Sequence, residues 1–384
     1  MRSAILGGAL LVVGAIAIAT GILPVPVAFA VADRVWPILL FVIAITVVTE
    51  LAAEAGLFTV VAERASRWGL GRAWLLWLLV LVLAVVSTVF LSIDTTAVLL
   101  TPVVVLLARH SGLSPLPFAL TTVWMANTAS LLLPVSNLTN LLAEHTLRGV
   151  GPAGFAALMA VPAIIAIVIP ATALFLIYRR ELHQRYQPAP STAADDRVLL
   201  VASGVTVAAL IPLLVSGLPV WIPAVAAAVT LAGFFVARRP AVLSFGLFPW
   251  QLVLLAAGLF VVVEAAHSVG LGALLSTASG HGTGPLDLLQ LAASGAVGAN
   301  AVNNLPAYLA LEPVAGSPVR LAALLIGVNA GPLVTPWASL ATLLWHARLT
   351  SLNVSISWRK YSLLGLVVAP VTVALATLGL ALVQ

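Results

Sequence analysis

The sequence contains no cysteine, and only 8% of its 384 residues are charged. The absence of cysteine excludes disulfide bonds, thiolate metal sites and thiol redox chemistry. A soluble domain would carry roughly 25% charged residues, so the composition argues against a soluble globular protein. A phosphate-binding P-loop motif is also absent, so the chain is not expected to use ATP in that way. No cofactor and no enzymatic activity are predicted.

Apolar residues, in contrast, are abundant. Hydrophobic residues make up 62% of the chain, and the mean hydropathy is +1.18. This composition predicts an all-α polytopic membrane protein, with the lipid bilayer as its surroundings. The net charge of +5 does not indicate a nucleic-acid partner, because the arginines lie in the loops between apolar segments.

Nine apolar segments are predicted to span the membrane, and two more are predicted to be re-entrant hairpins. The spans are residues 4–23, 36–56, 117–147, 152–178, 198–216, 220–237, 250–267, 321–347 and 361–383. The hairpins are 73–109 and 286–311; a straight helix over 73–109 would overshoot a bilayer core of about 30 Å. The amphipathic segment 57–72 is expected at the membrane interface. The polar segment 181–197 is predicted to be a cytoplasmic linker between a first repeat, 1–180, and a second, 198–384.

Lysine and arginine are distributed unequally between the two sides of this topology. The side that holds the N-terminus collects 14 of the 17 Lys and Arg residues, leaving Arg34, Arg148 and Arg320 on the other. The positive-inside rule therefore predicts a cytoplasmic N-terminus and a C-terminus outside. The span 198–216 has no counterpart in the first half, so the second repeat is inverted. The hairpin tips, 92–96 and 302–306, are then expected to meet near the middle of the membrane.

The spans 117–147 and 321–347 contain proline and polar residues where a lipid-facing helix would be apolar. Residues 126–140 read ANTASLLLPVSNLTN, and residues 326–344 read IGVNAGPLVTPWASLATLL. Proline removes a helical hydrogen bond, and non-helical backbone at membrane depth is tolerated only inside protein or beside a cavity. Pro134 aligns with Pro336, and the surrounding polar residues align at the same offset. Matched broken helices indicate a transporter's substrate site, although two proline-kinked helices with polar packing would give a similar pattern.

The polar residues of the two tips and the two breaks are predicted to form one substrate-binding site. They are Ser92, Asp94, Thr95, Thr96, Asn127, Thr128, Ser130, Ser136, Asn137, Asn140, Asn303, Asn304, Asn329, Thr335, Ser339 and Thr342. Lysine and arginine are absent from this set, and the helix ends add only partial positive charge. Such a site suits a small polar solute that is uncharged or weakly anionic.

Asp94 is the one acid of the predicted site, and it is the predicted proton carrier. An acid at membrane depth is costly, which makes a functional role the default hypothesis. The alternative is structural: the carboxylate would cap the second arm of the hairpin at the amides of Thr96 and Ala97. One proton moving down roughly 150 mV releases about 3.5 kcal/mol, which could sustain a gradient of a few hundredfold in a neutral solute. A single carboxylate is therefore sufficient for coupling.

Several of these segments resemble the ArsB arsenite permeases of the ion transporter superfamily. The segments are 94–102 (DTTAVLLTP), 127–130 (NTAS), 136–140 (SNLTN), 303–306 (NNLP), 331–345 (GPLVTPWASLATLLW) and 356–358 (ISW). The resemblance runs from about Trp36 onward. Many members of that family carry Asp where this chain has Asn127 and Asn329, so Asp94 bears more of the coupling hypothesis here.

The resemblance implies export of arsenite and antimonite, either by proton antiport or with an ATPase subunit. It also implies an elevator-type movement of hairpins and broken helices against the other spans, a homodimer, and the inner membrane of a bacterial-type cell. Arsenite at neutral pH is mostly an uncharged triol, which suits a site of hydroxyls and amides. Relatives in the superfamily carry dicarboxylates, citrate or sodium. A sodium-coupled importer of a small dicarboxylate or other anion, and a sodium–proton antiporter, are therefore the alternatives.

Overall fold

The computed structural model describes residues 2–147, 150–188 and 195–383. In these ranges every regular element is a helix, and the one extended pairing is an isolated bridge between Arg72 and Arg185. The predicted all-α class is therefore confirmed.

Within the same ranges, seven helices are long and apolar enough to cross a membrane. They are α2 (Val25–Glu54), α4 (Ala73–Phe90), α8 (Gly151–Ile177), α10 (Arg197–Leu214), α11 (Trp221–Arg238), α12 (Trp250–Ser268, with the turn before it) and α18 (Trp358–Leu382). The number differs from nine because α1 (Arg2–Ala19) counts only over its apolar part, Ala4–Ala19, and because the pieces of the two broken spans are also too short to qualify. The helix α4 qualifies although it was predicted as one arm of a hairpin.

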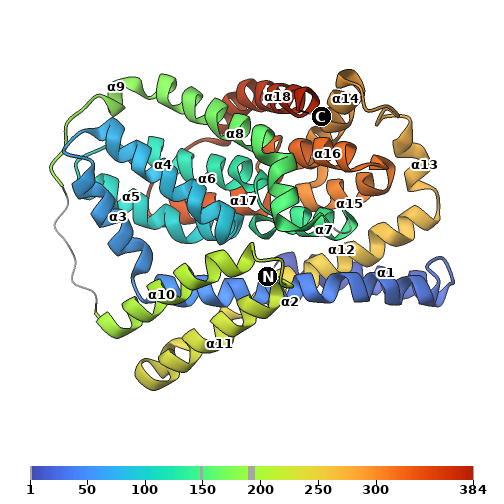
Figure 1. The fold of residues 1–384 in the computed structure, drawn as a ribbon, viewed down its shortest axis with the longest axis horizontal. Coiled ribbons are helices and arrows are strands. Elements are labelled where there is room, and N and C mark those ends of the chain that lie inside the picture. The colour runs from blue at the N-terminus through green and yellow to red at the C-terminus, as the bar shows by residue number, and fades with distance from the viewer. Residues whose placement is uncertain (1, 148–149, 189–194, 384) are drawn as a thin grey trace.

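The helices are arranged in two layers, called the lower and the upper layer after their places in Figure 1. The lower layer consists of α1, α2, α10, α11 and α12. The upper layer contains α4, α5 (Thr101–His110), α6 (Pro115–Thr128), α7 (Leu138–Thr146), α8, α14 (Pro285–Val302), α15 (Asn304–Ala315), α16 (Pro318–Ala330), α17 (Leu340–Ser351) and α18. Each layer therefore draws helices from both halves of the chain.

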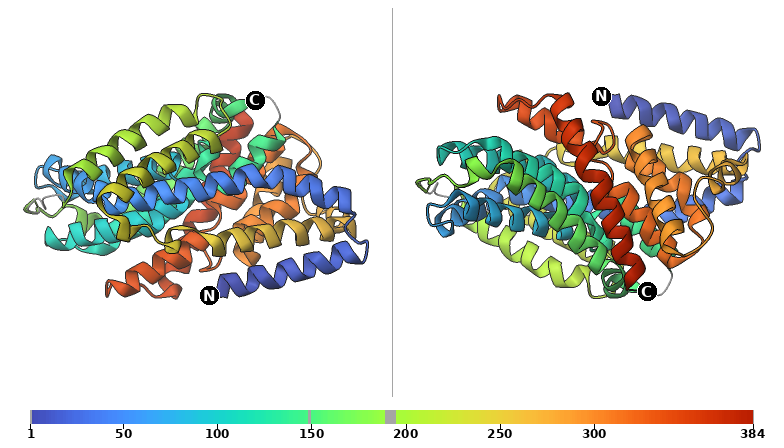
Figure 2. Two further views of the ribbon diagram at one scale, coloured as in Figure 1. Left: turned by 90° about the horizontal axis from the view of Figure 1, so that it is seen from below. Right: turned by 90° about the horizontal axis from the view of Figure 1, so that it is seen from above.

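Within each layer, helices from the first half of the chain pack against helices from the second half. In the lower layer α1 packs along α12, and α11 packs along α2. In the upper layer α8 packs against α18, which runs diagonally across the outer face (Figure 2). Each hairpin contacts the first part of its own broken helix: α4 and α5 contact α6, and α14 and α15 contact α16. This crossed pattern is the one expected of two inverted repeats, whose boundaries at 1–180 and 198–384 stay predictions.

Two short helices join the layers at opposite ends of the molecule (Figure 1). They are α3 (Leu57–Trp68) and α13 (Leu271–Ser276). Gly56 precedes α3 with a φ of 81°, and Gly270 precedes α13 with a φ of 101°, values that glycine adopts without steric cost. The sequence predicted the amphipathic segment that holds α3, but it did not predict α13 as its counterpart.

The loop after α13 is held to the upper layer by a buried arginine. Arg320, 4% exposed, donates from Nη1 to the carbonyl of Gly282 (2.8 Å) and from Nη2 to those of Ser279 (3.1 Å) and Gly280 (2.8 Å). Its Nε donates to the carbonyl of Ala315 at the end of α15 (2.7 Å). Carbonyl groups at a helix end and in a loop thus satisfy this buried cation without a carboxylate partner.

Small residues allow the upper-layer helices to approach closely. A Cβ atom on Gly327 of α16 would lie 2.1 Å from the carbonyl oxygen of Ala292 on α14. A Cβ atom on Gly365 of α18 would lie 1.7 Å from the carbonyl oxygen of Leu333, in the second break. Backbone-to-backbone contact of this kind holds membrane helices together where no hydrophobic effect does.

The second span is longer than predicted. It was expected at 36–56, but α2 begins at Val25 and includes Asp33 and Arg34. Proline is favourable in the first turn of a helix, where its missing N–H is not needed, and Pro26 lies there. The additional turns place Arg34 inside a helix rather than in a loop.

Candidate functional site

Both hairpin tips contain a residue with strained backbone. Ser92 has a φ of 152°, and Asn303 has a φ of 110° with a ψ of 154°. Residues other than glycine rarely adopt these values, and such strain concentrates at functional sites. Hydrogen bonds hold each tip in place: Ser92 Oγ accepts from the amide of Thr95 (3.2 Å), and Asn303 Nδ2 donates to the carbonyl of Trp337 (2.9 Å). Each predicted tip thus contains one residue other than glycine with a positive φ.

The strain at Asn303 gives a testable difference between two substitutions. Asn303→Ala and Asn303→Gly both remove the side-chain bonds, but only glycine adopts the backbone angles without cost. We expect the glycine variant to be more stable by about 1–2 kcal/mol, after allowing for the greater freedom of glycine in the unfolded chain. Equilibrium unfolding in mixed micelles measures this difference. Equal stability of the two variants would show that the tip is relaxed.

The two predicted broken helices are interrupted as expected. The first stops at Thr128, continues as short 3₁₀ turns at Ala129–Leu131 and Pro134–Ser136, and resumes as α7 at Leu138. The second stops at Ala330, and α17 begins at Leu340. Proline stands inside both interruptions, at Pro134 and Pro336, as the sequence required.

Asn329, near the end of α16, ties the second broken helix to the first. Its Oδ1 accepts from Asn137 Nδ2 (2.7 Å) and from Thr139 Oγ1 (3.0 Å), and its Nδ2 donates to Asn140 Oδ1 (2.8 Å). Asn140 in turn donates to the carbonyls that the first break leaves free, those of Ser130 (2.6 Å) and Leu133 (3.0 Å). Asn329 is 1% exposed, so this network stabilises the break from inside the protein.

Asn127 occupies the equivalent position in the first half, but it does not make the equivalent bonds. Its Nδ2 donates to the carbonyl of Val123 (2.9 Å) and, at 3.5 Å, to Thr342 Oγ1. Its buried Oδ1 has no hydrogen-bond partner in the part of the chain that the structure describes. The cause is in the sequence: the offset that aligns Asn127 with Asn329 aligns the donor Thr139 with Ala341, which has no donor. One half of the paired network is therefore satisfied and the other is not.

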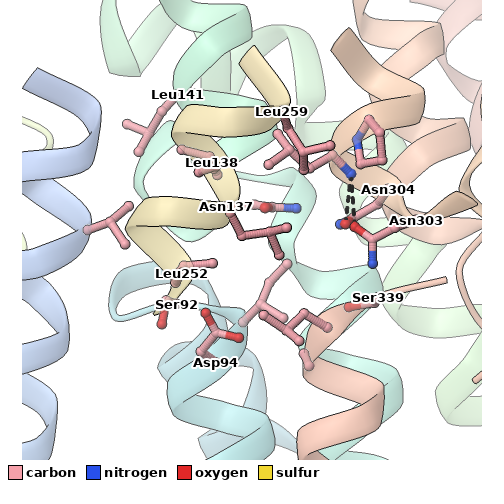
Figure 3. A pocket seen from close by; sticks show the side chains of 18 of the residues that line it. Ser92, Asp94, Asn137, Leu138, Leu141, Leu252, Leu259, Asn303, Asn304 and Ser339 are labelled. Carbon is pink, nitrogen blue, oxygen red and sulfur yellow. Dashed lines mark hydrogen bonds between the residues drawn. The ribbon is translucent and has the colours of Figure 1, made fainter. Parts of the chain in front are cut away.

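A cavity of about 390 Å³ lies where the tips and the breaks converge. Its wall includes residues 92–94 and 302–306 from the two tips, and residues 135–138, 337, 339–341 and 343 from the two broken helices. Helices α2 and α12 of the lower layer supply much of the remainder, so the cavity lies between the layers. Figure 3 shows Asp94 and Ser92 on one side of this space, with Asn303 and Asn304 across it.

Seven of the predicted site residues line the cavity. They are Ser92, Asp94, Ser136, Asn137, Asn303, Asn304 and Ser339. The other nine lie behind the wall, where several are engaged in hydrogen bonds of the two tips and breaks: Thr95, Thr96, Asn127, Thr128, Ser130, Asn140, Asn329, Thr335 and Thr342. Their geometry places them as supports of the wall rather than as part of it.

Among the described residues that line the wall, Asp94 is the only titratable side chain, and none is lysine or arginine. The structure does not show the capping role that was the alternative for Asp94. The Asp94 side chain makes no cap bond, and Ser92 Oγ instead accepts a hydrogen bond from the amide of Thr95. In the described ranges, the carboxylate has neither an ion pair nor a hydrogen-bond partner. It is therefore free to interact with a proton or a solute.

Three features of the site were not predicted from the sequence. Asn300 binds the second break: its Oδ1 accepts from the amide of Thr335 (3.0 Å), and its carbonyl accepts from Trp337 Nε1 (2.8 Å). Thr139 completes the Asn329 network. Much of the wall is apolar, with Phe41, Leu138 and Leu259 among its members. The sequence did give a signal for Asn300, because this polar residue stands three positions before Asn303 in a run of small residues. The apolar wall residues gave no signal, because they resemble those of any other membrane helix.

The fold and the cavity define a multi-pass membrane transporter, and comparison with known proteins agrees. Residues 3–342 match the model of the CitMHS family, described as citrate transporter. The chain therefore belongs to the citrate transporter family.

The named relatives of this chain are arsenical pumps. It is 31% identical to the arsenical pump membrane protein of Yersinia enterocolitica, over 99% of this chain and 95% of that protein. It is 32% identical to the protein of the same name from Escherichia coli K12, over 91% of this chain and 87% of that protein. It is 26% identical to a putative arsenical pump membrane protein of Bacillus subtilis, over 85% of this chain and 83% of that protein. The resemblance to the ArsB permeases is thus confirmed.

A solved transporter shares the fold. The YdaH transporter of Alcanivorax borkumensis, whose topology is described as unusual, superimposes with a TM-score of 0.58 at 15% identity, covering 92% of this chain and 86% of that one. At this identity the likeness concerns the fold alone.

Proposed function

We propose that the chain exports arsenite and antimonite in exchange for protons. The observation that carries the proposal is the cavity itself, whose wall joins both tips and both breaks and combines neutral hydrogen-bonding groups with a single carboxylate. The names of the relatives support the choice of solute.

The wall suits a neutral triol better than an anion. Arsenous acid offers hydroxyl groups that both donate and accept, and Asn137, Asn303 and Ser339 supply partners of both kinds. A dicarboxylate would bring two charges into a cavity where the described wall residues include no cationic side chain to balance them. The absence of cysteine from the chain leaves no thiolate that would hold arsenic too tightly to release it.

Asp94 is the proposed proton carrier. With no salt-bridge partner in the described part of the chain, its carboxylate can bind the solute or a proton but is not neutralised by the protein. Competition between the two at one group couples the flows in opposite directions, as antiport requires.

The proposal includes the way in which the cavity reaches each side of the membrane. The upper layer, which carries both hairpins and both broken helices, moves as an elevator against the lower layer. The proposed orientation, in the inner membrane of a bacterial cell, has a cytoplasmic N-terminus and a C-terminus outside. The resemblance to the ArsB permeases also implies a homodimer and an ATPase subunit, but the proposed mechanism requires neither.

Transport by everted membrane vesicles tests the proposal. In vesicles from a host without arsenite pumps, an acid interior should drive arsenite accumulation in the absence of ATP and sodium, because protons leave as arsenite enters. Radiolabelled or mass-spectrometric arsenite uptake measures this, with empty-vector vesicles as the control. Uptake of succinate or citrate that requires sodium would favour the importer instead, and arsenite uptake only with ATP would require a partner subunit.

A further inference from the structure

A second polar cluster crosses the two layers at some distance from the cavity. Glu312 of α15 accepts at Oε1 from Arg34 Nη2 of α2, from Thr146 Oγ1 of α7 (2.6 Å) and from Tyr308 OH (3.0 Å). Arg34 Nη2 also donates to Thr146 Oγ1 (3.1 Å) and to the carbonyl of Leu142 (3.4 Å). One lower-layer helix is thus bound to two upper-layer helices through a single carboxylate oxygen.

The Arg34–Glu312 pair is more buried than the other ion pairs of the described residues. The Glu312 side chain is 7% exposed and that of Arg34 is 29% exposed. The remaining pairs join the linker to the end of α11, with Asp196 at 15% and Asp195 at 84% exposure. Exposed pairs contribute little, whereas separating a buried pair is costly unless water reaches the charges.

All three helices of the cluster also form walls of the cavity. Glu312 lies nine residues beyond Asn303 along α15, and Thr146 lies nine residues beyond Asn137 along α7, in each case about 13 Å along a helix. Arg34 lies about 10 Å along α2 from Phe41, which lines the cavity. The cluster is therefore connected to the cavity walls through these three helices, although Arg34, Thr146 and Glu312 do not themselves line the cavity.

Space for the two charges to separate lies beside them. A hollow of about 550 Å³ is lined by Arg34, Thr146 and Glu312 together with Pro313 and residues 315–318. Water entering it could hydrate both charged groups once they part, which lowers the cost of separation.

We propose that Arg34 and Glu312 are positioning residues that clamp the lower layer to the upper layer and must separate in every transport cycle. The inference rests on the layer movement in the proposed function, but not on the identity of the solute. The two charges hold the arrangement described here, and their release permits the other.

The distance between the layers tests the clamp without any solute. Because the chain has no cysteine, Ala237→Cys on α11 and Ala347→Cys on α17, both exposed, can be spin-labelled as a reporter pair. In this background we expect Arg34→Gln and Glu312→Gln each to raise the population of a second interlayer distance about tenfold or more, as for loss of a charged hydrogen bond. The reciprocal swap, Arg34→Glu with Glu312→Arg, should restore the original distribution.

Tyr308→Phe is the matched control. It removes a bond to the same Glu312 oxygen, but Tyr308 and Glu312 belong to the same helix, so the loss does not cross the layers. Its distance distribution should equal that of the unmodified reporter pair. The clamp would be overturned if Arg34→Gln and Glu312→Gln kept the single distance of the reporter pair. It would also be overturned if Tyr308→Phe changed the distance distribution as much as they do.

Cross-linking distinguishes failure of the clamp from failure of the proposed function. A bifunctional thiosulfonate joining Arg34→Cys to Glu312→Cys should stop transport until it is reduced. The same reagent joining Thr146→Cys to Glu312→Cys, both in the upper layer, should leave transport as it is in that double variant before the reagent is added. Arsenite transport that continues when the layers are joined refutes the clamp but not the export. Shifted distances in a protein that carries no arsenite refute the export but not the clamp.

Discussion

Asp94→Asn is expected to abolish proton-driven accumulation of arsenite. Asparagine has nearly the size of aspartate and can still form hydrogen bonds, but it cannot exchange a proton, and no other titratable side chain among the described residues lines the cavity. The free energy of one proton crossing roughly 150 mV, about 3.5 kcal/mol, would no longer be available. The accumulation ratio in everted vesicles should therefore fall from a few hundredfold to about one.

The control for this result is an acid of the same chain outside the cavity. Glu54 at the end of α2 is exposed and does not line the cavity, so Glu54→Gln should accumulate arsenite as the unmodified protein does. Proton movement, followed with a pH-sensitive dye upon addition of arsenite, should disappear in Asp94→Asn alone. If Asp94→Asn still concentrated arsenite, the coupling group would have to lie elsewhere.

Asn329→Leu is expected to cost the protein about 3 kcal/mol or more of stability. Leucine has nearly the shape of asparagine, but it leaves Asn137 Nδ2, Thr139 Oγ1 and Asn140 Oδ1 without their partner. Each buried polar group that loses its partner costs roughly 1–3 kcal/mol. Unfolding in mixed micelles measures the loss, and a weaker arsenite affinity should accompany it because Asn137 lines the cavity.

Asn127→Leu provides the matched comparison for this variant. The residue is as buried as Asn329, at 1% exposure, but its Oδ1 has no partner to lose. The substitution also removes an orphaned acceptor, so its cost should be well below that of Asn329→Leu. If the two substitutions lowered the stability equally, the difference between the two hydrogen-bond networks would not contribute to stability.

The sequence was sufficient for those parts of the site that local chemistry determines. Pro134 and Pro336 break a helix wherever they stand, and the polar tip residues around Asp94 have no place in a lipid-facing helix. Their equal spacing in the two halves predicted the convergence that the cavity shows. The role of each residue in transport is a prediction that the experiments above test.

Contacts between distant residues could not be predicted in the same way. Arg34 and Glu312 are 278 residues apart, and neither is unusual in its own segment. The offset aligned Asn127 with Asn329, but it did not reveal that Asn329 Oδ1 would find two donors while Asn127 Oδ1 would find none, because that depends on which side chains the folded breaks bring within hydrogen-bond distance. The distinction between residues in the cavity wall and residues behind it likewise depends on the direction of each side chain.

In the layer movement proposed above, the connector α13 would limit how far the upper layer travels at its edge of the molecule. Arg320 fastens the loop that follows α13, while Gln290 and Ser294 bind the carbonyl of Ala278 in the same loop, so little slack remains there. The six residues of α13 then form a rigid segment about 9 Å long, which would rotate about Gly270. A rigid segment that rotates about one end moves its other end by at most twice its length. The proposed movement at this edge would therefore be at most about 18 Å, whatever solute the protein carries.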